Sequence, residues 1–587
     1  MSSPLRSLSR VLRSVAGAAV VLAIAACGGG GGGSSPSAIT STPQTQAVSP
    51  TSGSTGDTTT STLQATRLAH QASFGPSPAL VQAIAAQGPE AWIRAQFVTS
   101  GSRYSRGGGA DVHQWTGSGG YCDAKGGTCW RDNFSAEPLL WDFYRNALGQ
   151  PDQLRQRVAF ALSQVLVVSD LEVNGTYGLR RYHQLFLDNA FGNYGTLLKA
   201  VAKSPVMGDY LNNANNHKSA PNENFARELL QLFSLGTCLL NADGSLQGGR
   251  CQPVYDNTTV RQYAYALTGW TYPSGGATAW GCGSGTNCRF YGGDMVPAPA
   301  RHDTEARTLL AGFSLPASHG TEQALDTVIA SLVSHPNMPP FIGKQLIQHL
   351  VTSNPSAGYV GRVAAAFAAG QFQAPGGAIG SGTRGDLAAT VAAVLLDDEA
   401  RSATQAASFG KLREPVLFMT GVLRALDGVT DGESLSWWWG GAMNQHVFKP
   451  PSVFSYFPPD YPLPGGSGLQ APTFALHNAS TLLGRLNYLH YLLFWNGTVA
   501  ANSSVPEPLG TQVDLSGWTA KADDAATLVD AMAVRALGAP LPTSARGKVI
   551  DAVNVYNANT DRNNWRANRV RQAAYLVFAS PHYQVQK

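Results

Sequence analysis

Apolar residues recur at helical spacing along most of residues 63–587, and this periodicity constrains the fold more than any other feature of the chain. In one run, the apolar side chains that share a helical face are Leu154, Val158, Ala161, Leu162 and Val165. Residues three and four apart fall on one face of an α-helix, and such an apolar face is buried against other elements. Alternating patterns typical of strands are few. We therefore predict a mainly α fold, with a large multi-helix body over residues 63–587.

Further helical runs alternate with long irregular stretches. The runs cover residues 181–203, 221–235, 257–269, 321–333, 339–352, 357–369, 386–397, 411–425, 474–495, 523–536 and 562–578. The irregular stretches are residues 101–136, 238–252, 271–300, 371–384 and 429–469. Asp152 precedes the run that ends near Val168, and we expect its side chain to cap that helix. Loops of this length are usually functional or insertions, so a ligand is expected to meet the protein there.

The first residues have the pattern of a secretory signal. Arginines precede a short apolar run between Val15 and Cys27, and small residues stand directly before the cysteine. This pattern is typical of a bacterial lipobox, so we expect residues 1–26 to be a lipoprotein signal peptide and Cys27 to carry lipid. A membrane anchor and an ordinary cleaved signal are the alternatives. The apolar run is shorter than the ~20 residues that a spanning helix needs, which disfavours the anchor.

The residues that follow Cys27 predict a disordered tether. Residues 28–62 consist mainly of Gly, Ser, Thr, Pro, Gln and Ala, with Asp57 as the one charged residue. Such a segment buries too little apolar surface to offset the entropy of ordering it. By analogy with lipoprotein sorting, Gly28 in place of an Asp favours the outer membrane. We therefore expect an exported protein that is lipid-anchored to the cell envelope.

The charge of the chain is low and evenly spread. Charged residues make up 13% of the sequence, and the formal net charge is +4. No basic block stands out, and nucleic-acid-binding proteins usually have one, so we expect no nucleic-acid partner. A low charge instead fits a protein outside the cytoplasm.

Six cysteines besides Cys27 stand in close sequential pairs. The pairs are Cys122 with Cys129, Cys238 with Cys251, and Cys282 with Cys288. In an oxidising compartment, an even number of cysteines at short separations indicates disulfides. A metal site is the alternative, but no C-x-x-C pair occurs and the spacings vary. We predict that three sequential disulfides staple the long loops.

The densest group of polar residues lies on the segment 221–235. A proline near its start and a glycine just past its end predict a helix. On this helix Glu223 and Arg227 are four residues apart, and so are Asn224 and Glu228, which places each pair on one face. We expect this helix to be the central element of the bundle.

Three interpretations of this segment stay open. The carboxylates of Glu223 and Glu228 beside Arg227 are the residue types that acid–base chemistry on a glycan needs, because neighbouring charges separate the pKa values of two carboxylates. The same carboxylates with the amides of Asn222 and Asn224 are also ligands for a hard cation. The third interpretation is a structural network of hydrogen bonds and ion pairs.

Several segments of the chain resemble a known bacterial family. They are residues 67–76, 155–159, 189–194, 221–229, 232–236, 266–270, 302–303, 335–337, 340–342, 410–415 and 450–454. In residue pattern and in order along the chain, they are similar to the family catalogued as domain of unknown function 1800. The resemblance covers most of residues 63–587. It implies a secreted or envelope protein, often encoded beside a sulfatase-like family, and it supplies no catalytic residue. The loops 101–136 and 271–300 look individual to this chain.

Two other groups of residues are candidates for a site. His302 with Asp303 has the composition of a ligand or a base oriented by a carboxylate, although we favour a structural His and an Asp that caps a following helix. Trp437, Trp438 and Trp439 lie in a Gly-rich stretch, where aromatic faces on a loop would stack on sugar rings. Alternatively, these rings cover the helical body or form a patch for a partner protein.

The common enzyme signatures are missing. We find no G-x-S-x-G, P-loop or H-E-x-x-H motif, and the G-x-G-x-x-G match at residues 380–385 follows no predicted strand. Whether the protein is an enzyme, and which metal or cofactor it uses, is not given by the sequence. Our first hypothesis is a lipid-anchored envelope protein that binds, or helps to assemble or export, an envelope glycan or a partner such as a sulfatase-like protein. The second is an extracytoplasmic, glycan-directed hydrolase that uses Glu223 or Glu228 with Arg227.

Overall fold

The computed structural model describes residues 55–109, 111–113, 119–276, 280–465, 468–495 and 498–587. The predicted signal peptide, Cys27 and most of the predicted tether lie outside these residues. The first helix, α1 (Thr55–Ala72), begins before residue 62, where we expected the tether to end. Leu68 and Ala69 anchor this helix in the core. No helix in the described residues combines the length and the hydrophobicity that crossing a bilayer requires.

The body is built from helices, as predicted. The first half contains α1, α2 (Pro78–Gln87), α3 (Pro89–Val98), α4 (Cys129–Phe134), α5 (Glu137–Gly149), α6 (Gln153–Val165), α7 (Thr176–Asp188), α8 (Tyr194–Lys203), α9 (Pro205–Tyr210), α10 (Asn224–Gln231) and α11 (Asn257–Ala266). The second half contains α12 (Thr321–Ser334), α13 (Met338–Leu350), α14 (Ala357–Ala369), α15 (Leu387–Leu396), α16 (Asp398–Arg401), α17 (Pro415–Ala425), α18 (Ala479–Phe494), α19 (Ala525–Leu537), α20 (Thr543–Asn554), α21 (Trp565–Ala579) and α22 (Pro581–Gln584).

Shorter helical turns and small antiparallel sheets connect these helices. The turns are η1 (Gln247–Gly249), η2 (Pro299–Arg301), η3 (Leu435–Gly440), η4 (Pro472–Leu476) and η5 (Ser516–Lys521). The two-stranded sheets pair β1 (Trp270–Thr271) with β2 (Val296–Pro297), β3 (Arg307–Thr308) with β4 (Ser314–Leu315), β5 (Phe372–Ala374) with β6 (Gly377–Ile379), and β7 (Lys411–Leu412) with β11 (Val585–Gln586). A three-stranded sheet has the order β8 (Val429–Thr430), β10 (Thr511–Gln512), β9 (Thr498–Val499).

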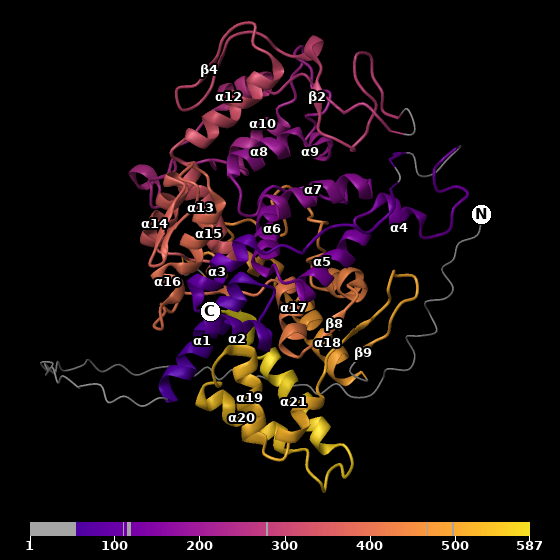
Figure 1. Cartoon of the computed structure of the whole chain (residues 1–587), viewed down its shortest axis with the longest axis vertical. Helices are drawn as coiled ribbons and strands as arrows, with labels where there is room; N and C mark the ends of the chain where they lie inside the picture. The colour runs from indigo at the N-terminus through magenta and orange to yellow at the C-terminus, as the bar shows by residue number, and fades with distance from the viewer. Residues whose placement is uncertain (1–54, 110, 114–118, 277–279, 466–467, 496–497) are drawn as a thin grey trace, which may run out of the picture. The chain divides into compact units, whose positions relative to one another are not determined.

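The helix α6, and not the segment 221–235, lies at the centre of the packing. It contacts α1, α3, α5, α7 and α13, whereas α10 packs chiefly on α11. Around it, α13, α14 and α15 form one group and α18 to α21 another, as Figure 1 shows. Nearly every side chain of α6 is buried, including polar ones such as Gln156 and Arg157. A helix buried on all sides needs hydrogen-bond partners for such polar groups, and this requirement explains much of the buried polar network described below.

Local capping sets several helix boundaries. Ser77 accepts a hydrogen bond from Leu80 N at the start of α2, and Asp386 accepts one from Ala389 N at the start of α15. Asp152 does not cap α6 with its side chain as we had predicted. Its carboxylate instead accepts hydrogen bonds from the backbone N (2.9 Å) and Oγ (2.6 Å) of Ser102. Ser102, which is distant in sequence, therefore takes the place of the backbone N–H groups at the start of α6 as the partner of Asp152.

The three sequential disulfides are confirmed. Their sulfur atoms join Cys122 to Cys129, Cys238 to Cys251, and Cys282 to Cys288. All three lie in or beside the long irregular stretches, which they tie locally. Because each ring is short, each bond restrains its own loop and leaves the helical body independent of it.

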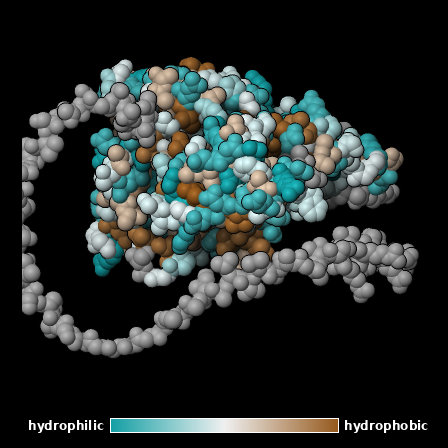
Figure 2. All heavy atoms as spheres, turned by 90° about the horizontal axis from the view of Figure 1, so that it is seen from below, coloured by the Kyte–Doolittle hydropathy of each residue, from teal (hydrophilic) through white to brown (hydrophobic). Residues whose placement is uncertain are grey.

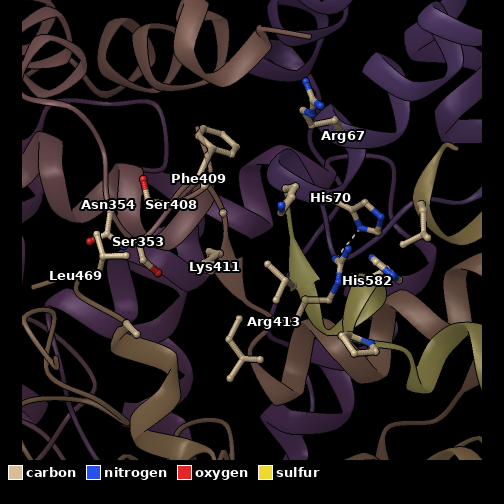
Figure 3. A pocket seen from close by; sticks show the side chains of 18 of the residues that line it. Arg67, His70, Ser353, Asn354, Ser408, Phe409, Lys411, Arg413, Leu469 and His582 are labelled. Carbon is tan, nitrogen blue, oxygen red and sulfur yellow. Dashed lines mark hydrogen bonds between the residues drawn. The ribbon is translucent and has the colours of Figure 1, made fainter. Parts of the chain in front are cut away.

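The surface is mixed in polarity, and its hollows include a cavity at α1, β7 and β11. On the face drawn in Figure 2, hydrophobic residues form separate patches among hydrophilic ones. The cavity has a volume of about 560 Å³ and is also bordered by the segment 463–474 (Figure 3); another hollow, between α2, α19 and η5, has about 790 Å³. The pairing of β7 with β11 brings the end of the described chain to the first cavity.

Candidate functional site

The helix α10 carries the acidic residues that the sequence singled out. It is shorter than predicted: Glu223 is its N-cap residue and the α-helical part ends at Gln231. Glu223 forms the predicted ion pair with Arg227, with Oε2 and Nη2 3.1 Å apart. Both side chains are more than one-third exposed, so this pair lies on the surface.

The predicted pairing of Asn224 with Glu228 is replaced by a contact with an asparagine-rich loop. Asn224 Nδ2 donates to Asn212 Oδ1 (3.1 Å), and Asn222 N donates to Asn216 Oδ1 (2.8 Å). Asn212 has a φ of 59°, a left-handed conformation that asparagine tolerates better than most residues. The amides of Asn222 and Asn224 therefore serve the entry to α10.

Glu228 is half-buried and not fully hydrogen-bonded. Its Oε2 is buried with no hydrogen-bond partner, and the same is true of the phenol oxygens of Tyr210 and Tyr255. Burial raises the pKa of Glu228, although the charge of Arg227 opposes this shift. Burial is also the main cause of the raised pKa of Tyr255, about 12, to which the charge of Glu228 contributes. These three side chains thus share one environment and offer unpaired polar atoms to a ligand.

A groove begins one turn further along α10. It has a volume of about 270 Å³ and lies between α10, α13 and the segment 454–470; we call it the α10–α13 groove. Its lining consists of Gln231, Leu232, Leu235, Gly236, Thr237, Cys238, Leu240, Gly244, Leu246, Phe341, Lys344, Gln345, Gln348, Phe454, Pro459, Asp460 and Gln470. A smaller cavity of about 50 Å³ shares Leu232, Phe341, Gln345, Gln348, Phe454 and Pro459 with it. Glu228 is three residues before Gln231 and four before Leu232, so it lies on the helix face that leads into the groove.

Two aromatic rings and four side-chain amides are among the groups that line the groove. Phe454 exposes 46% of its surface, and Phe341 is partly exposed. Gln345 is buried, and its Nε2 has no hydrogen-bond partner. The amide of Gln348 is engaged by contrast, because it donates to Pro459 O (3.2 Å) and Gln470 Oε1 (3.1 Å) and so fixes the segment 459–470.

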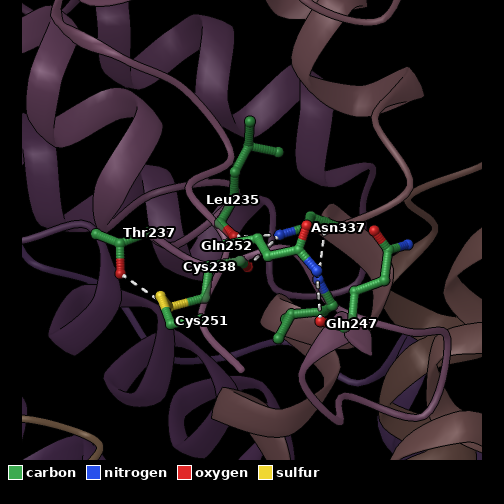
Figure 4. The surroundings of a disulfide bond; sticks show 8 residues. Leu235, Thr237, Cys238, Gln247, Cys251, Gln252 and Asn337 are labelled. Atoms are coloured by element: carbon green, nitrogen blue, oxygen red, sulfur yellow. Dashed lines mark hydrogen bonds between the residues drawn. A yellow bond between two sulfur atoms is a disulfide. The ribbon is translucent and has the colours of Figure 1, made fainter. Parts of the chain in front are cut away.

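The disulfide between Cys238 and Cys251 shapes one wall of the groove (Figure 4). Beside it, Leu239 N donates to Gln252 O (2.7 Å), which closes the hairpin. Asn337 then ties the hairpin to α13, because its Nδ2 donates to Leu235 O (3.1 Å) and Cys238 O (2.8 Å). The wall is therefore preformed by covalent and hydrogen-bonded constraints.

Comparison with known proteins identifies the family. The family model of DUF1800, described as a protein of unknown function, matches residues 67–585. The chain belongs to the DUF1800 family. No curated protein and no solved structure matches the chain.

A buried ion pair that we had not predicted lies deep in this DUF1800 protein. Lys411 Nζ and Glu414 Oε1 are 3.1 Å apart, with both side chains almost fully buried. Gln445 Nε2 (2.9 Å) and Gln164 Nε2 (3.2 Å) donate to the other carboxylate oxygen of Glu414. Burial alone would raise the pKa of Glu414, but the charges of Lys411 and Arg157 lower it overall. The carboxylate is ionised and satisfied, which marks a structural network.

A second buried cluster joins three separate segments. Lys449 Nζ lies 3.2 Å from Glu137 Oε1 and 3.5 Å from Asp170 Oδ2. Ser436, on η3, donates to Glu137 Oε2 (2.7 Å). Burial raises the pKa of Asp170 to about 7, and Lys449 opposes this shift. Perturbed carboxylates of this kind occur at functional sites and in structural networks alike. None of these residues lines the groove.

The loops that we judged individual to this chain meet at a third cluster. Tyr272 and Tyr291 donate to the two oxygens of Asp209, and Arg289 Nε is 3.1 Å from Asp209 Oδ2. Tyr291 N donates to Tyr177 Oη (2.8 Å). His113, from the loop 101–136, packs edge-on against Tyr291, with ring centroids 4.5 Å apart. The two loops therefore support each other.

His302 and Asp303 are both buried and engaged. His302 donates from Nδ1 to Thr268 O (2.8 Å), and burial lowers its pKa. Asp303 accepts two hydrogen bonds of 2.7 Å from Arg307. No helix begins at Asp303, so its interpretation as a cap is wrong; the next elements are β3 and β4. The bidentate ion pair instead fixes the turn between His302 and β3.

The tryptophan triplet lies in a π-helix, η3, and not in an open loop. Trp439 is buried and packs against Tyr488 at a centroid distance of 5.6 Å. Trp438 is 70% exposed. The side chain of Trp437 lies outside the described part of the chain. Of the triplet, Trp438 thus presents a surface to solvent.

The described residues contain no group of three or more His, Cys, Asp or Glu side chains that is arranged to hold a metal ion. The sequence reasoning did not bring Phe341, Gln345 and Phe454 into one site, although all three line the groove. Phe341 and Phe454 belong to the segments 340–342 and 450–454, which resemble the family, and these were the available signals. Phe341 and Gln345 are separated from α10 by more than a hundred residues, so no local pattern connects them to it.

Proposed function

We propose that this DUF1800 protein is an exported, lipid-anchored envelope protein that binds an extended, hydroxyl-rich polymer in the α10–α13 groove. An envelope glycan is the polymer of this chemistry. The observation that carries the proposal is the buried, unpaired Nε2 of Gln345 beside the exposed ring of Phe454. A buried polar atom without a partner costs free energy, and a ligand hydroxyl would remove that cost.

The chemistry of the lining supports a sugar. Aromatic rings stack on the apolar faces of sugar rings, and Phe341 and Phe454 offer such surfaces. Amide side chains both donate and accept hydrogen bonds, as sugar hydroxyls do, and the groove contains Gln231, Gln345 and Gln470. The α10–α13 groove is partly open to solvent, as a site for a polymer longer than the groove must be.

Affinity electrophoresis of the full-length protein tests this proposal. Native gels would contain one soluble polysaccharide each: hydroxyethyl cellulose, xylan, dextran or alginate. We expect at least one of them to slow the migration of the wild type. Phe454→Ala and Gln345→Leu should each weaken the affinity obtained from this retardation by about tenfold. The first removes a stacking surface, and the second removes the unpaired amide.

Trp438→Ala is the matched control, since it removes another exposed aromatic ring outside the groove. This variant should migrate like the wild type in every gel. If Trp438→Ala abolishes the retardation and Phe454→Ala does not, the polymer binds at η3 and the groove proposal is wrong. Migration unaffected by all four polysaccharides would also contradict it.

Anchoring through Cys27 and a location in the outer membrane are part of the proposal. They are supported by the lipobox pattern and by Gly28. Labelling of growing cells with a radioactive fatty acid should mark the wild type and not Cys27→Ser. Co-purification of a sulfatase-like protein from solubilised envelopes would support assistance to such a partner.

A second candidate function is hydrolysis of the same polymer. The raised pKa of Glu228 favours it, because a general acid must hold its proton near neutral pH. Glu228 also lies on the helix face that leads into the groove. If Glu228→Gln still binds the polysaccharide that retards the wild type but no longer releases reducing ends from it, the protein is an enzyme. If the wild type releases none, this candidate fails and the binding function stands.

A further inference from the structure

The charged side chains that line the cavity at α1, β7 and β11 are all basic. The volume of the cavity is about 560 Å³, within the range of small-molecule sites. Arg67, Arg413 and His582 line it, whereas no Asp or Glu side chain does. In Figure 3, His70, Arg413 and His582 lie together on one side of the pocket. The lining shares only Gln470 with the α10–α13 groove.

A histidine holds one guanidinium group of this pocket, that of Arg413. His70 follows Arg67 by one turn of α1, and its Nδ1 accepts a hydrogen bond from Arg413 Nη1 (2.8 Å). The Nε2–H of His70 donates to Ala536 O (3.0 Å), so the ring is neutral and adds no charge of its own. His70 therefore positions Arg413 without competing for an anion.

These guanidinium groups are buried without a carboxylate. Arg67 is 7% exposed and Arg413 is 3% exposed. Their hydrogen bonds to the backbone go to uncharged carbonyls: Arg67 Nη1 donates to Ser402 O (2.6 Å), and Arg413 Nε donates to Tyr583 O (2.5 Å). Arg67 Nε is buried with no partner.

The positive charge extends beyond the pocket wall. Arg485 is buried near Arg413 and Arg401 is partly buried near Arg67, and no ion pair of the described residues includes any of these four side chains. Burial, together with the charge of Arg67, lowers the pKa of Arg401 to about 10. Buried charges are normally paired because an unpaired one is costly. An anion in the pocket would supply the missing charge.

Apolar side chains form much of the remaining lining, next to polar ones such as Ser353, Asn354 and Ser408. Phe409, Leu412, Leu463, Phe474, Leu537 and Val585 line the pocket. We infer that the pocket binds an anionic amphiphile, with a carboxylate or phosphate head at Arg67 and Arg413 and an apolar body against the leucine, valine and phenylalanine side chains. Arginine recognises both head groups through paired hydrogen bonds. This inference does not depend on the polymer bound in the groove.

Calorimetric titration of the full-length protein in a neutral sugar detergent tests the inference. The probes are hexanoate, hexyl phosphate, inorganic phosphate and hexan-1-ol. We expect hexanoate or hexyl phosphate to bind at least about tenfold more tightly than the last two, since only these probes have both head and body. The better of the two identifies the head group. If inorganic phosphate binds as tightly as these two probes, the ligand needs no apolar body and the inference of an amphiphile is wrong. If neither hexanoate nor hexyl phosphate binds below about 10 mM, the pocket is not an anion site.

Substitutions at the rim keep the test independent of folding. Ala407 is exposed and lines the pocket, so Ala407→Glu adds a negative charge without removing a contact. It should weaken binding of the anionic probe several-fold, whereas Ala407→Lys should preserve or strengthen it. Arg67→Gln should weaken binding by about tenfold, and Arg562→Gln, at an exposed arginine that does not line the pocket, should not. Equal affinities for Ala407→Glu and Ala407→Lys would contradict the inference.

Discussion

Glu414 and Glu228 are two glutamates of one helical body with opposite surroundings. Glu414 is fully buried, and both of its carboxylate oxygens have partners, namely Lys411, Gln445 and Gln164. Glu228 is half-buried and has one buried oxygen with no partner. Burial raises the pKa of both groups, but at Glu414 nearby positive charges reverse the shift and lower it.

The difference separates two uses of a buried carboxylate. At Glu414 the surrounding cation and amides give both carboxylate oxygens a partner, and they fix three segments to one another. At Glu228 the protein leaves polar atoms unpaired beside a groove, which stabilises nothing in the free protein but suits a ligand. Carboxylates with a stabilising role should therefore respond to substitution very differently from those of a site.

The largest effect should come from Glu414→Gln. Removing the charge leaves Lys411 buried without its counter-ion, and we expect a loss of about 3–5 kcal/mol in the free energy of unfolding. Urea unfolding of the full-length protein measures it. Glu305→Gln, at a mostly exposed side chain, is the control. Lys411→Met combined with Glu414→Leu should recover most of the loss. If Glu414→Gln unfolds at the same urea concentration as the wild type, the contrast between Glu414 and Glu228 is contradicted.

The pH dependence of the free energy of unfolding should reveal the proton that Asp170 holds in the folded protein. Its pKa is about 7 in the folded protein because of burial, above the ordinary value of about 3.9, so the folded state holds a proton that the unfolded state releases. Stability from this group is therefore lost as the pH rises from about 4 to about 7. Asp170→Asn should remove that loss, so its stability relative to the wild type should rise by about 2–3 kcal/mol across this window.

The quantity to compare is the difference in the free energy of unfolding between Asp170→Asn and the wild type at each pH. Burial lowers the pKa of His446 to about 4, and a buried neutral histidine makes stability rise with pH over an overlapping window. Subtracting the wild-type curve removes this opposite contribution. Parallel curves for Asp170→Asn and the wild type would show that Asp170 is ionised in the folded protein.

The smallest effect should come from Glu223→Gln. Its ion pair with Arg227 is exposed to solvent, and such pairs contribute about 0–0.5 kcal/mol to the free energy of unfolding. Arg227→Gln should behave in the same way in the same urea experiment. A loss near that of Glu414→Gln would mean that the entry to α10 is structural after all.

Local patterns made much of the fold predictable. Helical periodicity, Pro at first turns and Gly after last turns act within a few residues, and so do the three disulfides. The predicted helix at 411–425 shows the limit: Lys411 and Leu412 form a strand because they pair with Gln586 and Val585, and the helix begins at Pro415. A partner from the other end of the chain overrides local propensity.

The candidate site was predictable only in part, for the same reason. The pair of Glu223 with Arg227 is an i,i+4 contact and was found from the sequence. Glu228 was singled out, but the groove beside it needs Gln345 and Phe454, which tertiary packing supplies. Trp439 is buried against Tyr488, a residue on α18 that no local pattern links to the triplet.

The most direct test of the account is the unfolding of Glu228→Gln beside Glu414→Gln, in urea and in the full-length protein. The account predicts that Glu228→Gln changes the free energy of unfolding by less than about 1 kcal/mol, or raises it, because this carboxylate is kept for a ligand at a cost to the fold. A loss as large as that of Glu414→Gln would return Glu228 to the structural network and contradict the placement of a site at this end of the groove.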